Sequence, residues 1–189
     1  MRKKTLLNLL LILGIAAFFI PGLGLGYSCK LAANRVFASS PHFIESTERV
    51  KIADYNWRLK DEDWDIFEFD RSEGKWIYIN FWASWRLPSE AELKSISEFH
   101  EKYKDKIDFY IITNEERPPV LEFMEEEEYD FPVTYLIIGD AIPVDPKTPS
   151  SYLINPEGEI VIHERGISRW NSSSFYKKLN ALLKAEPSE

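Results

Sequence analysis

The fold is decided by residues 76–89, which read WIYINFWASWRLPS. Residues 76–82 are apolar on both faces of an extended chain, which is typical of a central strand that is covered on both sides. After Pro88 the period changes, and apolar residues recur at helical spacing at Leu93, Ile96, Phe99 and Tyr103. The sequence therefore predicts a buried central strand that turns directly into an amphipathic helix.

Outside this stretch the chain alternates between strand and helix patterns. The expected elements are a leading hairpin within 57–69, a strand over 107–112, a helix from Pro118 through Met124, a strand over 131–138, a hairpin of 152–154 and 160–162, and an amphipathic helix over 175–183. This order predicts an α/β fold: a mixed sheet flanked by helices on both faces, with an extra N-terminal β-hairpin.

Four spaced motifs occur in a fixed order along the chain. They are NFWASW at 80–85, DFY at 108–110 followed by Thr113-Asn114, TPSSYLI at 148–154, and PEG at 156–158. Together they resemble thioredoxin-like proteins of the membrane-tethered TlpA and ResA type, a family of thiol-disulfide oxidoreductases. The resemblance covers roughly residues 57–183 and implies a thioredoxin-like fold, with thiol-disulfide exchange as the activity of the family.

The position of the family's active-site motif lacks both cysteines. In such proteins Trp85 would be followed by Cys-x-x-Cys, whereas here it is followed by Arg86-Leu87-Pro88-Ser89. Exchange needs a thiolate that attacks a disulfide and a second thiol that resolves the mixed disulfide. The one cysteine of the chain, Cys29, lies outside this region. We therefore expect a redox-inactive member with no catalytic residue, no cofactor and no metal site.

Arg86 and Ser89, which occupy the degenerate motif positions, each allow two interpretations. Arg86 stands at the start of the predicted helix, where it either meets a carboxylate or phosphate over the helix end or is a surface arginine paired with Glu90 or another acid. Ser89 with Glu92 fits a capping box. A nucleophilic role for Ser89 needs an oriented base, and the sequence places none of its three histidines beside it.

The resemblance also implies a groove at Thr148-Pro149. In thioredoxin-like domains the matching proline is cis and lies against the active-site turn, where the backbone of the preceding residue can pair with an extended peptide. The alternative is that Pro149 only shapes the fold. Trp82 is expected in the core and Trp85 at the groove as an apolar contact. The candidate binding residues are therefore Trp85, Arg86, Thr148 and Pro149.

The N-terminus starts with MRKK and continues with an apolar stretch from Leu6 to Ile20. A basic flank before an apolar core is typical of a signal peptide or a membrane anchor. Cys29 follows the small residue Ser28, so lipidation of Cys29 is one interpretation and an unmodified thiol is the other. The expected organisation is a signal or anchor over 1–29, a tether over 30–51 and a thioredoxin-like domain over 52–189. This predicts an exported bacterial protein that faces the periplasm and is tethered to the membrane.

The charge balance narrows the choice of partners. The chain has 23 Lys and Arg against 31 Asp and Glu, a net charge of -8, which argues against a nucleic-acid partner. The acidic run Glu125–Glu128 indicates a solvent-exposed helix face, to which we assign no function. The predicted function is a protein- or peptide-binding module at the cell envelope, without metal. Two alternatives stay open: a component of cell redox homeostasis that works with a thiol partner in trans, and a small-anion receptor at Arg86.

Overall fold

The computed structural model of this chain describes residues 8, 12, 25–138 and 148–185, in two compact units, 1–37 and 38–189. In the first unit, helix α2 (Leu25–Phe37) carries an exposed Cys29. Among the described residues, no helix has the length and apolar character needed to cross a membrane. The apolar stretch predicted as a signal or anchor lies almost wholly outside the described residues.

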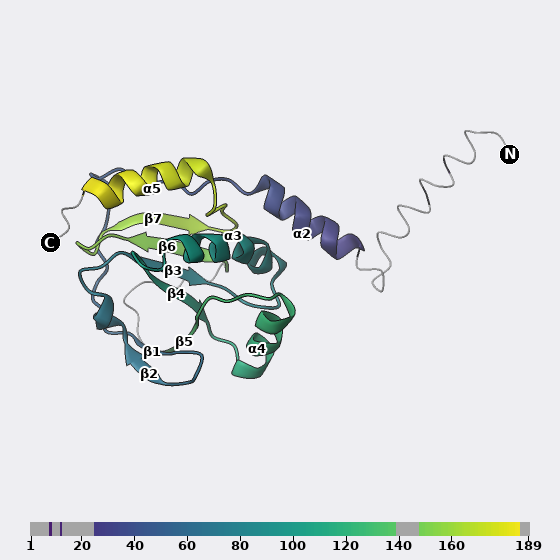
Figure 1. The fold of residues 1–189 in the computed structure, drawn as a ribbon, viewed down its shortest axis with the longest axis horizontal. Helices are drawn as coiled ribbons and strands as arrows, with labels where there is room; N and C mark the ends of the chain where they lie inside the picture. The colour runs from purple at the N-terminus through teal and green to yellow at the C-terminus, as the bar shows by residue number, and fades with distance from the viewer. Residues whose placement is uncertain (1–7, 9–11, 13–24, 139–147, 186–189) are drawn as a thin grey trace. The chain divides into compact units, whose positions relative to one another are not determined.

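The second unit is built on a seven-stranded mixed sheet with the strand order β2-β1-β5-β4-β3-β6-β7 (Figure 1). The strands are β1 (Arg58–Lys60), β2 (Ile66–Glu68), β3 (Ile77–Phe81), β4 (Asp108–Thr113), β5 (Val133–Ile138), β6 (Ser150–Ile154) and β7 (Ile160–Arg165). Strand β3 pairs parallel with β4 and antiparallel with β6, so it lies near the middle of the sheet. The hairpin of β1 and β2 joins through antiparallel pairing of β1 with β5. The expected α/β class and the extra N-terminal hairpin are confirmed.

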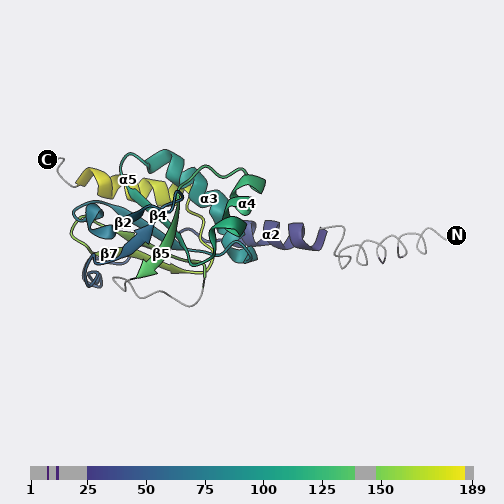
Figure 2. The same cartoon turned by 90° about the horizontal axis from the view of Figure 1, so that it is seen from below.

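The expectation of helices on both faces of the sheet is wrong for the described residues. The helices α3 (Leu87–Tyr103), α4 (Arg117–Glu126) and α5 (Ser173–Ala185) all contribute to the same hydrophobic cluster, on one side of the strands (Figure 2). The opposite cluster, around Trp57, Ile77 and Ile79, is covered by the short 3-10 helix η2 (Phe69–Ser72) and by side chains from residues 44–55. An apolar strand face must be covered, but its own pattern does not specify that the cover is helical.

Residues 38–51, part of the expected tether, are hydrogen-bonded to the domain. The Ile44 amide donates to the carbonyl of Val161 at 2.9 Å, and the Ile160 amide donates to the carbonyl of Val50 at 2.9 Å. The earlier part of that expected tether, residues 30–37, is helical within α2. The segment that follows α2 thus lies along β7 and extends the edge of the sheet.

Candidate functional site

The turn between β3 and α3 holds the degenerate motif. The Trp82 amide donates to the carbonyl of Ile112 at 3.0 Å, which continues the pairing of β3 with β4. The Ala83 amide donates to Ser89 Oγ at 3.2 Å, and the Arg86 amide donates to the Ala83 carbonyl at 3.1 Å. These bonds close the turn immediately before α3 begins.

The predicted capping box at the start of α3 is wrong. Arg86 is the residue that precedes the helix, and no side chain caps its first turn. Ser89 is fully buried, and its hydroxyl accepts the Ala83 amide of the preceding turn. Because no part of Ser89 is exposed, the structure gives it a role in holding the turn and offers no surface from which it could act as a nucleophile.

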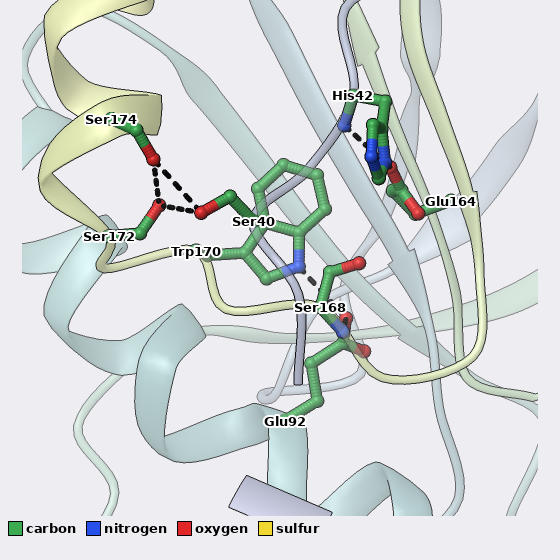
Figure 3. Close-up of polar contacts among 8 residues, drawn as sticks. All are labelled: Ser40, His42, Glu92, Glu164, Ser168, Trp170, Ser172 and Ser174. Atoms are coloured by element: carbon green, nitrogen blue, oxygen red, sulfur yellow. Dashed lines mark hydrogen bonds and ion pairs between the residues drawn. The ribbon is translucent and has the colours of Figure 1, made fainter. Parts of the chain in front are cut away.

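Glu92, the other member of that box, is buried in the core of the domain, where it is 1% exposed. Its Oε1 accepts from the indole nitrogen of Trp170 at 2.9 Å and from the Ser168 amide at 3.0 Å (Figure 3). Its Oε2 accepts from the side-chain amide of Asn80 at 3.1 Å. Burial outweighs these hydrogen bonds and raises the pKa of Glu92 from 4.5 to about 8. This carboxyl group is therefore mostly protonated at neutral pH.

A pocket of about 270 Å³ lies beside the turn; we call it the Trp85 pocket. Its walls are Phe81, Trp82, Ala83, Trp85, Arg86, Ile112, Thr113, Asn114, Leu136 and Thr148. Trp82 is 1% exposed, as expected for a core residue, whereas Trp85 is 70% exposed. The Thr148–Pro149 bond is cis, as the resemblance implies. The pocket thus brings together three of the four predicted binding residues, Trp85, Arg86 and Thr148. The fourth, Pro149, is buried and is not among the residues that line it.

Among the described residues that line this pocket, Arg86 is the one that carries a charge. Its guanidinium carbon lies 4.7 Å from the centre of the Trp85 ring, and its Nη1 donates a long hydrogen bond of 3.5 Å to the Thr148 carbonyl. The interpretation in which Arg86 pairs with Glu90 is wrong, because the ion pairs of the described residues do not include it. Glu90 is instead buried, which together with the charge of Glu127 raises its pKa.

A second acid, Glu115, holds the turn from the neighbouring strand. It accepts from the Ser84 amide and from the Ser84 hydroxyl, both at 2.7 Å, and from the Thr113 hydroxyl at 3.1 Å. Both oxygens of this carboxylate are therefore engaged within the protein. The contact fixes the backbone that precedes Trp85 and so positions the exposed indole at the pocket.

The comparisons with known proteins agree with this fold. The AhpC/TSA family model matches residues 53–163, more than half of the chain. The chain belongs to the AhpC/TSA family. This AhpC/TSA protein is 30% identical over 142 residues to thiol-disulfide oxidoreductase ResA of Bacillus subtilis (strain 168), a match that covers 72% of this chain and 74% of that protein. It is also 30% identical over 152 residues to ResA of Halalkalibacterium halodurans, covering 77% and 86%. The resemblance to the ResA type is confirmed.

Solved structures show the same thioredoxin-like fold for this AhpC/TSA protein. A DsbF homologue from Corynebacterium diphtheriae superposes with a TM-score of 0.56 at 14% identity, covering 79% of this chain and 95% of that one. A thiol:disulfide interchange protein of the thioredoxin family from Chlorobium tepidum gives a TM-score of 0.54 at 17% identity, covering 77% and 95%. The fold is thus that of thiol-disulfide proteins, whereas this chain has a single cysteine.

Sequence reasoning missed Glu92 and Glu115 as parts of this site, although a signal existed for each. Glu92 shares one helical stripe with Ile96 and Phe99, at i, i+4 and i+7, so its phase places it on the apolar face. Glu115 follows the end of β4, which is parallel to β3. Neighbouring parallel strands end at the same edge of a sheet, so Glu115, just after β4, lies close to the turn that follows β3.

Proposed function

We propose that this AhpC/TSA protein is an exported, membrane-tethered binding module that holds an extended peptide segment of a partner protein in the Trp85 pocket and performs no thiol-disulfide exchange. The observation that carries the proposal is the pocket itself. An exposed indole and apolar walls persist at a motif from which both sulfur atoms are missing.

The absence of exchange follows from the chemistry of the motif positions. A thiolate must attack the disulfide, and a second thiol must resolve the intermediate. Arg86 offers a guanidinium and Ser89 a buried hydroxyl, and neither group can take these roles. Cys29 is the single thiol of the chain and belongs to the other compact unit, in α2. No dithiol couple can form within one chain.

Peptide binding is supported by the character of the pocket walls. Phe81, Ile112 and Leu136 form an apolar floor that suits one apolar side chain of a partner. Trp85 is 70% exposed beside it, and large aromatic side chains at the rim of a pocket are frequent anchors of protein-protein contacts. The backbone of Thr148 lies at the same pocket and can pair with an extended chain.

Export and tethering are supported by the N-terminal sequence. Arg2, Lys3 and Lys4 precede the apolar stretch, and a basic flank of this kind stays in the cytoplasm while the following chain is translocated. Protease added to spheroplasts is expected to degrade the domain, whereas intact cells protect it.

Photo-crosslinking in cells tests the binding function. A benzoylphenylalanine at position 85 is expected to capture one partner reproducibly, while the same probe at position 64 captures none. Trp64 is the matched control because it is an exposed tryptophan, 40% exposed, in the β1–β2 hairpin rather than at the pocket. Equal capture at both positions, or sustained reduction of insulin disulfides by the purified native protein, would show that the proposal is wrong.

A further inference from the structure

The guanidinium of Arg86 has fewer partners than its position requires. The Nε of Arg86 is buried and makes no hydrogen bond among the described residues. Among the same residues, the guanidinium donates one hydrogen bond, the long one from Nη1 to the Thr148 carbonyl. A guanidinium has five N–H donors in a planar fork. Removing such a charge from water is unfavourable unless an anion or several acceptors compensate it.

Among the described residues, no acid close to the turn forms an ion pair with Arg86. Both oxygens of Glu115 accept hydrogen bonds from Ser84 and one of them also accepts from Thr113. Glu90 is 4% exposed and makes no ion pair with Arg86 among the described residues. Among the described residues, the lining of the pocket is therefore apolar or neutral except for one partly buried cation that makes no ion pair.

We propose that Arg86 binds a carboxylate of the peptide segment in the Trp85 pocket, so that the protein selects an acidic segment with an adjacent apolar side chain. This inference rests on the proposed peptide-binding function. A carboxylate matches the planar fork of a guanidinium with two parallel hydrogen bonds. The centre of the Trp85 ring lies 4.7 Å from the guanidinium carbon, so the ring packs against the cation at the pocket.

One feature of the surroundings favours an anion at this place, whereas the net charge of the whole chain does not. Arg86 immediately precedes α3, a helix of 17 residues, and the positive end of the helix dipole adds to the charge of the guanidinium. The net charge of the chain is -8, so long-range attraction does not assist an acidic peptide. Discrimination between a carboxylate and its neutral amide must therefore arise from the local contact with Arg86.

The test uses two libraries of acetylated, amidated random hexapeptides, one with a central glutamate and one with a central glutamine, passed over the immobilised native domain. We expect retention of the glutamate library to exceed that of the glutamine library about tenfold, which corresponds to about 1.4 kcal/mol. Arg86→Gln is expected to abolish this preference, and Arg86→Lys to keep part of it because the charge stays but the fork is lost. Equal melting temperatures of the variants confirm that they are folded.

The outcomes distinguish failure of this inference alone from failure of the proposed function. Equal retention of both libraries by the native domain overturns the role of Arg86 while leaving peptide binding intact. Retention of neither library overturns both. If sodium acetate at a concentration equal to that of the peptide displaces the glutamate library, the site is a small-anion site and the peptide proposal is wrong.

Discussion

Glu92→Gln is expected to change how the stability of the domain depends on pH. Burial raises the pKa of Glu92 from 4.5 to about 8. Between these two values the folded protein keeps the proton, whereas the unfolded chain releases it, so the free energy of unfolding falls as the pH rises. The stabilisation by the protonated group is complete below pH 4.5 and is lost as the pH rises to about 8.

The size of the effect follows from the same pKa difference. A rise from 4.5 to about 8 corresponds to a loss of about 5 kcal/mol once the group is ionised in the folded state. Glutamine stays neutral at every pH and avoids this loss. Its amide can replace Oε2 of Glu92 and face Asn80, whose Oδ1 has no hydrogen-bond partner among the described residues. If the side-chain amide of Asn80 rotates by half a turn, its Oδ1 accepts a hydrogen bond from the NH2 group of the new glutamine.

Urea unfolding of both proteins from about pH 5 to about pH 9 measures this effect, because other groups titrate equally in both and cancel in the difference. We expect similar stabilities at about pH 5 and a variant about 5 kcal/mol more stable at about pH 9. Glu125→Gln, at an exposed position of α4, is the matched control for the loss of one negative charge. A difference that stays within about 1 kcal/mol across this range would refute the reasoning, since Glu92 would then be ionised in the folded state without penalty.

Two further substitutions test the contacts that position the site and the last helix. Glu115→Gln puts an NH2 donor where one of the two carboxylate oxygens accepts from Ser84. We expect this variant to lower the free energy of unfolding by about 1–2 kcal/mol in urea titrations. Glu116→Gln, at the exposed neighbouring position, is its control. Ser172→Ala removes the hydroxyl that accepts the Phe175 amide at 3.3 Å at the start of α5, with an expected cost of about 1 kcal/mol. If neither Glu115→Gln nor Ser172→Ala lowers the free energy of unfolding by about these amounts, the assigned contacts are wrong.

Most elements of the fold were predictable because their signals are local. The apolar run at 77–81 and the helical spacing over 87–103 correspond to β3 and α3. The turn between β6 and β7 also follows from its own residues: the Gly158 amide donates to the Asn155 carbonyl at 2.9 Å, and Gly158 has a φ of +76°, as glycine permits. Ser172 caps α5, since its hydroxyl accepts from the Phe175 amide three residues later, a contact that is also local.

The capping box shows where such local reasoning fails. Ser89 and Glu92 have the correct spacing for it, but the pattern does not indicate whether Glu92 returns to the backbone or enters the core. The Trp170 indole and the Ser168 amide, 78 and 76 residues away, supply its hydrogen bonds. A contact between residues so far apart in the chain depends on how the whole sheet is assembled.

The position of Arg86 shows the same division. Counting cysteines was sufficient to exclude a dithiol couple, because that chemistry requires two sulfur atoms that the chain does not contain. The sequence allowed Arg86 either a surface ion pair or an anion site. The folded chain brings Thr148 to within hydrogen-bond distance of Arg86 and places no acid of the described residues in an ion pair with it, which is the environment from which we propose the anion site. Composition limits which reactions are available, whereas the environment of a charge is set by residues that folding brings next to it.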